Sequence, residues 1–270
     1  MARPCPSPTH SSTGTPAMTI LGITLITLVT GLASMGIHGL IQRWVDHRRL
    51  RNLNDVAAAV YTNFGVLFSL ILGILIGQGE ERRGDISSAA VHEAAILMDL
   101  VNVAQAYDDE VGRAVHTAAI GYASAVIDEE WPLLAEHQGG RIKRAPLEQL
   151  WRISKAIDPN GPRGQALYDT TVSMLENLAE ARYERISVAN DNLSDLLRFV
   201  LWVGAAFTIA FLWFFGAENQ KVQLLLTGIV TSMLSLVLIL VLSMNNPLAG
   251  ELGVRPEPFV KLLRDLSSAS

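Results

Sequence analysis

The sequence predicts an all-α integral membrane protein in which two transmembrane helical hairpins flank a soluble helical-bundle domain. Two observations carry this prediction, the scarcity of charge and its uneven placement. Half of the 270 residues are hydrophobic and only 17% are charged, against about 25% in a typical soluble domain. Residues 4–42 and 56–79 contain no Lys, Arg, Asp or Glu at all. A surface helix of a soluble protein would not avoid charge over such lengths, because one of its faces meets water.

Four segments are long and apolar enough, or nearly so, to cross a membrane, which takes about 20 residues of helix. They are residues 18–41, 56–77, 199–216 and 222–244. The fourth is the most apolar, with fourteen Leu, Ile and Val residues. The third is shorter, but Trp202 and Trp213 lie near its ends, as aromatic residues do at membrane interfaces.

The two ends of the chain are predicted to be tails. Residues 1–17 are rich in Pro, Ser and Thr, which predicts disorder, and residues 245–270 follow the last span. The apolar run of the first span is too long for a secretory signal, and Arg3 is the only basic residue before it. This span is therefore expected to be retained as a membrane helix. Met18 stands at the start of this span and is a candidate for the true translation start.

The charges near the spans leave the sidedness of the protein open. Residues 42–55 form an Arg-rich loop between the first two spans, with Arg43, Arg48, Arg49 and Arg51. Short loops rich in Arg and Lys are typically cytoplasmic, which places the central domain outside. Other arginines favour a cytoplasmic central domain, because they follow the second span or precede the third. They are Arg82, Arg83, Arg182, Arg185 and Arg198. The balance favours an external domain only slightly.

Residues 78–198 are predicted to be the soluble helical domain. Apolar residues recur at three-, four- and seven-residue spacings from Tyr168 to Leu197, which predicts a buried helix face. No Gly or Pro occurs in residues 165–203, so this helix is expected to run unbroken into the third span. Residues 85–106 are likewise expected to continue the second span. Shorter helices are predicted at 108–131 and 145–156, with loops at 139–140 and 158–164.

The sequence offers little that could support catalysis or a cofactor. Residues 80–196 contain twenty acidic and eleven basic side chains, whereas nucleic-acid binding needs a clustered basic face. His92-Glu93 begins like a zinc-protease helix, but Ile96 stands where the second histidine is required. Asp128-Glu129-Glu130 could bind a cation through oxygen atoms, yet solvated charge at a helix end is the more ordinary interpretation. We therefore expect no enzyme, no metal site, no cofactor and no nucleic-acid partner.

The second and fourth spans carry three residue patterns, each with two possible interpretations. In the second span, Tyr61, Phe64 and Phe68 share one helix face, and Gly73 and Gly77 form a small-xxx-small pair. In the fourth span, a mildly polar stripe recurs at every fourth position: Gln223, Thr227, Thr231 and Ser235. Helix packing is the preferred interpretation of these residues. The alternative is a pore lining, with the aromatic face as a hydrophobic constriction.

Several short motifs, in order, resemble the bestrophin-like domain, a family of bacterial and plant membrane proteins without an established activity. They are Asn54-Asp55-Val56-Ala57, Gly65-Val66-Leu67-Phe68, Val91-His92-Glu93-Ala94, Tyr122 and Val126, Glu130-Trp131-Pro132, Asn246-Pro247 and Val254–Phe259. The resemblance covers roughly residues 18–266. Gln78-Gly79-Glu80 and Leu248 depart from the family pattern. Glu93, Glu130, Trp131, Pro132 and Pro247 are the residues that the resemblance singles out.

The resemblance implies an architecture and an activity. Bestrophins are oligomeric ion channels with four spans per subunit and a helical cytosolic domain between the second and third spans. Their constriction lies on the second span, which by analogy is the face of Tyr61, Phe64 and Phe68. The implied cytosolic domain conflicts with the sidedness that the Arg-rich loop favours.

Two hypotheses about function follow. The first is a homo-oligomeric channel for small ions in the plasma or inner membrane, with the second span lining the pore and the lipid bilayer as its partner. The second is a membrane-anchored sensor or scaffold whose helical domain binds a ligand or a protein.

Overall fold

The computed structural model describes residues 20–44, 54–191, 193–214, 219–250 and 253–268, and every regular element in these ranges is helical. The tail at residues 1–17 and most of the Arg-rich loop lie outside them. The helices are α1 Ile20–Trp44, α3 Asn54–Ala104, α4 Asp109–Ala125, α5 Trp131–Ala135, α6 Ala145–Lys155, α7 Gly161–Asn190, α8 Asp195–Phe214, α9 Gln220–Met244 and α10 Glu257–Ser268. A π-helical turn spans Val126–Glu130 and a 3-10 turn spans Gly139–Arg141.

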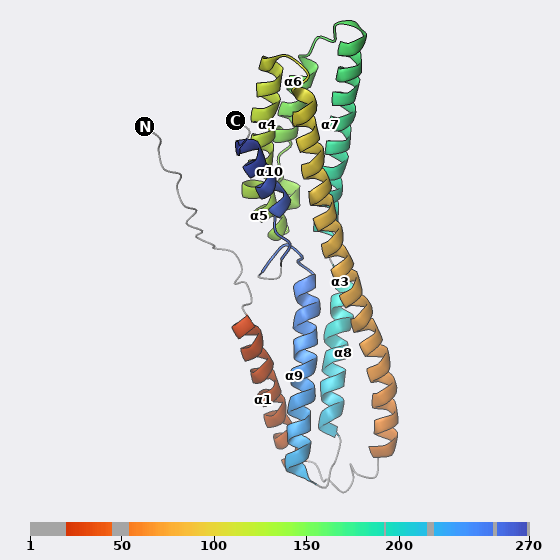
Figure 1. The fold of residues 1–270 in the computed structure, drawn as a ribbon. Coiled ribbons are helices and arrows are strands. Elements are labelled where there is room, and N and C mark those ends of the chain that lie inside the picture. The colour runs from red at the N-terminus through yellow and green to blue at the C-terminus, as the bar shows by residue number, and fades with distance from the viewer. Residues whose placement is uncertain (1–19, 45–53, 192, 215–218, 251–252, 269–270) are drawn as a thin grey trace, which may run out of the picture.

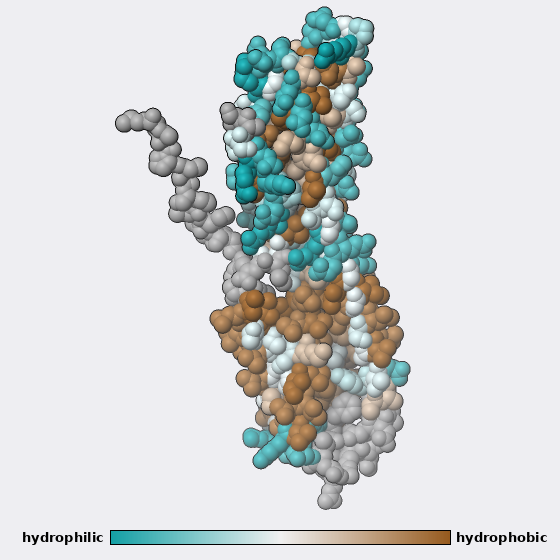
Figure 2. Space-filling view, in the orientation of Figure 1, coloured by the Kyte–Doolittle hydropathy of each residue, from teal (hydrophilic) through white to brown (hydrophobic). Residues whose placement is uncertain are grey.

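The molecule is elongated and has two sections (Figure 1). The apolar section contains α1, residues 54–78 of α3, α8 and α9, and the stalk contains the rest of α3 with α4 to α7 and α10. On the face drawn in Figure 2, the apolar section has a largely hydrophobic surface and the stalk a largely hydrophilic one. Four helices among the described residues are long and apolar enough to cross a membrane. They contain the described residues of the four predicted spans, which confirms the all-helical class and the number of apolar spans.

Helix α3 joins the two sections without a break. It has 51 residues and is therefore about 75 Å long at a rise of 1.5 Å per residue. Gly73, Gly77 and Gly79 all lie within it, because a single glycine weakens a helix by only about 1 kcal/mol. The prediction that residues 85–106 continue the second span is confirmed as far as Ala104, where α3 ends.

The prediction of an unbroken helix from residue 165 into the third span is wrong. Helix α7 ends at Asn190, Asp191 is extended, and α8 begins at Asp195. Side chains satisfy the backbone at the break: the Leu193 N–H donates to Asn245 Oδ1 at 2.7 Å, and the Leu197 N–H donates to Ser194 Oγ at 3.3 Å. Asn, Asp and Ser side chains favour such caps over helix interiors, and this stretch of the sequence is rich in them.

The other stalk helices agree with the prediction from the sequence, with two differences. Helix α6 lies where predicted, with Pro146 in its first turn. Helix α7 already begins at Gly161, inside the predicted loop, because Pro162 is tolerated in a first turn. The helix expected at residues 108–131 is α-helical only to Ala125 and then widens into the π-helical turn.

Close packing and small residues hold the apolar section together. Helix α1 lies along α9, and α3 contacts both α8 and α9. A Cβ atom added to Gly31 of α1 would lie only 2.2 Å from Ser232 Oγ of α9. Glycine at this position therefore lets the two helices approach closely, as small residues do in membrane helix pairs.

The stalk has a continuous hydrophobic core between α3, α4 and α7. Leu97 of α3, Ala119 of α4 and Leu178 of α7 are all fully buried in it. Helix α10 lies against α3 and α4 and closes one side of this core with Phe259, Leu262 and Leu266. The C-terminal segment predicted as a tail is thus in part a packed helix of the stalk.

Candidate functional site

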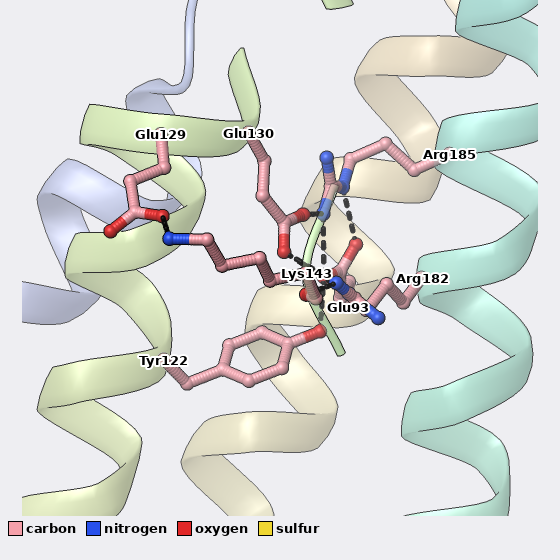
Figure 3. A network of polar contacts seen from close by, with 7 residues as sticks. All are labelled: Glu93, Tyr122, Glu129, Glu130, Lys143, Arg182 and Arg185. Atoms are coloured by element: carbon pink, nitrogen blue, oxygen red, sulfur yellow. Dashed lines mark hydrogen bonds and ion pairs between the residues drawn. The ribbon is translucent and has the colours of Figure 1, made fainter. Parts of the chain in front are cut away.

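A network of charged side chains lies buried inside the stalk, where four elements meet (Figure 3). Arg185 of α7 donates from Nε to Glu93 Oε2 of α3 at 2.6 Å and from Nη2 to Glu130 Oε2 of the π-helical turn at 2.6 Å. Arg182 of α7 donates from Nη2 to Glu130 Oε1 at 2.6 Å. The Tyr122 hydroxyl of α4 donates to Glu93 Oε1 at 2.6 Å. Glu93 and Arg185 are fully buried, so these contacts form in the absence of bulk water.

The π-helical turn brings Glu130 into this network. Pro132 has no N–H to donate back into the helix, and the Trp131 N–H bonds to the Val126 carbonyl, five residues earlier. Such single π-turns are frequent at functional sites. Asp128 and Glu129 remain exposed, whereas Glu130 is only 3% exposed. Of these three acidic residues, only Glu130 is therefore buried like a residue of the core.

Aromatic rings cover the network on the side of α10. The guanidinium of Arg185 lies 5.7 Å from the ring centre of Trp131 and 5.6 Å from that of Phe259, within reach of a cation–π attraction. Trp131 Nε1 donates to the Val254 carbonyl at 3.0 Å. The segment that follows α9 is thereby fixed to the network, and so is α10.

Burial and the two carboxylates together determine the ionisation of Tyr122 and Arg185. It raises the pKa of Tyr122 well above its usual value of 10.0, and the Glu93 carboxylate raises that pKa further. Burial alone would lower the pKa of Arg185, but Glu93 and Glu130 outweigh it and the pKa is raised. Tyr122 is therefore held neutral as a hydrogen-bond donor, and Arg185 is held charged. Arg185 Nη1 has no hydrogen-bond acceptor among the described residues.

The network is suited to fixing the helices of the stalk relative to one another. Two carboxylates face two guanidinium groups, and solvent has no access to Glu93 or Arg185. No group of three or more His, Cys, Asp or Glu side chains within the described ranges is arranged to bind a metal ion. Removing one partner from such a network leaves a buried unpaired charge, which is strongly destabilising.

Sequence reasoning singled out part of this network and missed the rest. Glu93, Glu130 and Trp131 lie in it or against it, whereas Pro132 is exposed. From the sequence alone, Arg182 and Arg185 are interpreted only as charges that affect sidedness. Their three-residue spacing places them on the same face of α7 as Leu175, Leu178 and Ala189. That alignment with the apolar seam was the signal available in the sequence.

A second group of contacts at the boundary between the sections involves Pro247. It is buried, and its carbonyl accepts from the Val254 N–H at 2.8 Å. The neighbouring Asn246 Nδ2 donates to the Ala135 carbonyl of α5 at 2.7 Å. Together with the Asn245 cap of the α7–α8 break, these bonds tie the end of α9 to the stalk.

The aromatic face of α3 lies against α8 of the same chain. Phe64 packs on Phe68 with ring centres 5.9 Å apart and on Phe207 at 6.3 Å. Tyr61 lies 6.2 Å from Phe211. Phe68 is only 5% exposed, and a Cβ atom on Gly204 of α8 would lie 2.3 Å from its ring. The three predicted residues are thus brought together, in a contact between two helices of one chain.

The polar stripe of α9 faces α1. Thr227 Oγ1 lies 2.8 Å from His38 Nδ1, Thr231 Oγ1 donates to Ser34 Oγ at 2.9 Å, and Gln42 Nε2 donates to Gln223 Oε1 at 3.1 Å. Ser235 is half-buried on the same helix. Gly73 and Gly77 differ, since both are exposed and an added Cβ atom on either would meet nothing within 4 Å. No part of the described chain packs against this pair.

Comparisons with known proteins agree with this architecture. Residues 28–259 match the family model of the Bestrophin-like domain. Crystal structures of a bacterial bestrophin homologue from Klebsiella pneumoniae have similar folds. A variant of it with one tryptophan replaced by alanine shares 13% identity, with a TM-score of 0.67 over 93% of this chain and 97% of that one. A variant with one tyrosine replaced by alanine shares 10% identity, with a TM-score of 0.66 over 91% and 98%. No curated protein sequence matches the chain.

Proposed function

The chain belongs to the bestrophin-like family and is a membrane protein, and from this premise we propose that it assembles as a homo-oligomer and conducts small ions. The observation that carries the proposal is the fold. A family match over residues 28–259 and similarity to bacterial bestrophin structures over nearly their whole length both support a channel-type subunit. No catalytic step is proposed, because the buried network offers no accessible nucleophile.

We further propose that the protein is a multi-pass protein of the plasma or inner membrane, with two transmembrane hairpins and the stalk as its soluble domain. The direction of the helices supports this arrangement. Helices α1 and α3 run in opposite directions, as do α8 and α9, and the C-terminal ends of α1 and α8 and the N-terminal ends of α3 and α9 lie at the end far from the stalk (Figure 1). The hydrophobic face of the apolar section supports it as well (Figure 2).

Two faces of α3 are candidates for the pore lining. The aromatic face of Tyr61, Phe64 and Phe68 is the one expected from the resemblance, yet α8 covers Phe68 in a single chain. The opposite face of the helix remains exposed: Asn63, Val66, Leu70, Gly73 and Gly77. We propose that this exposed face lines the pore. The aromatic face then supports it from behind by holding α3 against α8.

Conductance of the purified protein in planar lipid bilayers tests the proposal. Val66→Trp places a large ring on the exposed face and is expected to reduce single-channel conductance several-fold, because a narrow apolar constriction gates by excluding water. Leu236→Trp on α9 is the matched control, since Leu236 is also exposed and apolar, and should leave conductance unchanged. Absence of conductance at all voltages and salt concentrations would refute the channel function.

The variant Phe64→Ala tests which of the two faces of α3 lines the pore. If the aromatic face forms the constriction, removing this ring should raise the conductance and alter ion selectivity. If the exposed face lines the pore, Phe64→Ala should lower the thermal stability and leave the open-channel conductance close to that of the wild type.

A membrane-anchored sensor is the second candidate, and the continuity of α3 favours it. A helix of 51 residues would carry a displacement of the stalk directly into the apolar section. A protein without conductance whose stalk becomes protected from hydrogen exchange by a ligand would support this function.

A further inference from the structure

A groove opens between the end of α1 and the start of α9, at the end of the apolar section far from the stalk. Its volume is about 460 Å³, and its lining comes from both helices. Figure 2 shows a hydrophilic edge at this end of the hydrophobic surface. The groove is separate from the exposed face of α3 and from the buried network, so neither of the sites described above accounts for it.

One half of the groove is apolar and open. Gly36 and Gly39 form part of its wall, beside Met35, Leu40 and Leu224. A Cβ atom on Gly36 would meet nothing within 4 Å, and one on Gly39 would meet only Leu224, at 3.8 Å. Leu40 is 55% exposed. Such a surface leaves room beside the helices for an extended hydrocarbon chain.

The other half of the groove is polar and basic. Gln42, Arg43 and Gln220 line it, and Lys221 follows as the next residue of α9. The Gln42 amide is held in place, 3.0 Å from His38 Nε2 and 3.1 Å from Gln223 Oε1. Within the described part of the chain, neither Arg43 nor Lys221 forms an ion pair. The groove therefore presents positive charge that no carboxylate of these residues neutralises.

The sequence around the groove also carries a net positive charge. Residues 42–53 and 215–221 together contain five basic and two acidic side chains, and α1 and α9 contain no Asp or Glu. The Asn219 side chain accepts from the Lys221 and Val222 N–H groups at the start of α9, and the helix N-terminus adds a partial positive charge at this end, which favours a nearby anion. An anion with an apolar tail complements both halves of the groove.

We propose that the α1–α9 groove binds an anionic phospholipid, with its phosphate at Arg43 and Lys221 and one acyl chain along Gly36 and Gly39. The apolar half selects a lipid over a free phosphate ion, because a soluble anion would leave that half wet. This inference depends on the insertion of α1 and α9 into the membrane, as proposed above, and not on conduction.

Native mass spectrometry of the full-length protein in detergent tests the proposal. The protein is titrated with phosphatidylglycerol and, separately, with phosphatidylcholine of the same acyl chains. Wild-type protein should retain phosphatidylglycerol preferentially. The double variant Arg43→Gln, Lys221→Gln should weaken this binding by roughly 25-fold, at roughly fivefold for each basic residue near a membrane surface.

Two further variants make the result specific to the groove. Gly36→Leu fills the apolar half without a collision at Cβ and should weaken the binding of phosphatidylglycerol while both basic side chains remain. Arg198→Gln removes an exposed arginine at the other end of the spans, where it pairs with Asp195, and should leave lipid binding unchanged.

Three outcomes would overturn the proposal. Equal retention of the two lipids would show that charge does not select the occupant. Unchanged binding in both groove variants would place the lipid elsewhere. Complete displacement of phosphatidylglycerol by millimolar glycerol 3-phosphate would identify a site for soluble phosphates. A conducting protein could give any of these results, and a silent protein could retain the lipid, so this test and the conductance test fail independently.

Discussion

The stalk and the apolar section are both built from long helices, but opposite kinds of polar contact hold them together. In the stalk, the polar core consists of full charges, with Arg182 and Arg185 paired to Glu93 and Glu130. In the apolar section, the described polar contacts between helices are neutral, such as Thr231 with Ser34 and Thr227 with His38. The two sections therefore respond to the loss of a polar group in very different ways.

The difference follows from what surrounds each section. The stalk buries its own core and can enclose a balanced set of charges, each with several partners. In the apolar section the helices expose large hydrophobic side chains such as Leu21, Leu67 and Phe199, a surface suited to contact with lipid. A charge there would face hydrocarbon at a cost of several kcal/mol, so small residues and hydroxyl groups make the contacts.

The largest effect is expected from Arg185→Leu. It leaves Glu93 and Glu130 buried without their shared partner, which should lower the free energy of unfolding of the stalk by about 3–5 kcal/mol. Chemical unfolding in detergent, followed by circular dichroism, measures it. Lys143→Ala is the matched control, because the Lys143–Glu129 pair is exposed and its loss should cost less than about 0.5 kcal/mol. Similar costs for the two variants would contradict the role given to burial.

Tyr122→Phe tests the neutral member of the same network. It removes one hydrogen bond to a buried carboxylate, which should cost about 2 kcal/mol at neutral pH. Because the folded-state pKa of Tyr122 is raised, its contribution to stability is fully present below the unfolded pKa of about 10 and is lost as the pH rises through the folded pKa. The stability difference between wild type and variant should therefore narrow above about pH 10. A difference that stays constant through the folded pKa would show that Tyr122 is not the titrating group.

Gly204→Ala probes the apolar section by packing. The added methyl group would lie 2.3 Å from the Phe68 ring, so α3 and α8 must shift, at an expected cost of about 1–3 kcal/mol. Phe68→Leu should recover part of this loss in the double variant, measured as a coupling energy in thermal unfolding. Gly73→Ala, where an added Cβ meets nothing within 4 Å, is the control. Additive effects of Gly204→Ala and Phe68→Leu would argue against direct contact.

Thr231→Val is expected to have the smallest effect. It removes the hydrogen bond to Ser34 of α1, and bonds of this kind between membrane helices contribute about 0.6 kcal/mol on average. The measurement is the same unfolding assay, with Ser243→Ala as a control, because the Ser243 hydroxyl bonds only within its own helix. A cost close to that of Arg185→Leu would remove the contrast between the sections.

The sequence predicted the spans well because they depend on local composition. Residues 56–79 contain no charge, and hydrocarbon imposes that requirement on every residue of a span. The same local logic failed at the end of α7, where no Gly or Pro marks the break. The break depends on Asn245, which is 52 residues away from Leu193 along the chain, and no local pattern contains that contact.

The candidate site was only partly predictable, for a similar reason. The resemblance singled out Glu93 and Glu130, but their partners became visible only when α7 was placed beside α3 and the π-helical turn. Arg182 and Arg185 look like ordinary membrane-flanking charges when the sequence is considered alone. The pairing of α1 with α9 was equally hidden, because it joins the first and the last span of the chain.

Because α3 is unbroken, it fixes both the distance and the relative rotation between the apolar section and the stalk. Each residue of an α-helix turns the chain by about 100°, so one residue inserted near Gly79 would rotate Glu93 away from Arg185 by more than a quarter turn. Seven inserted residues would return it to within about 20° of its original direction, although about 10 Å farther along the axis. The length of α3 therefore fixes the rotation of the stalk relative to the apolar section. Insertions and deletions among related proteins should be excluded from this stretch and confined to the loops.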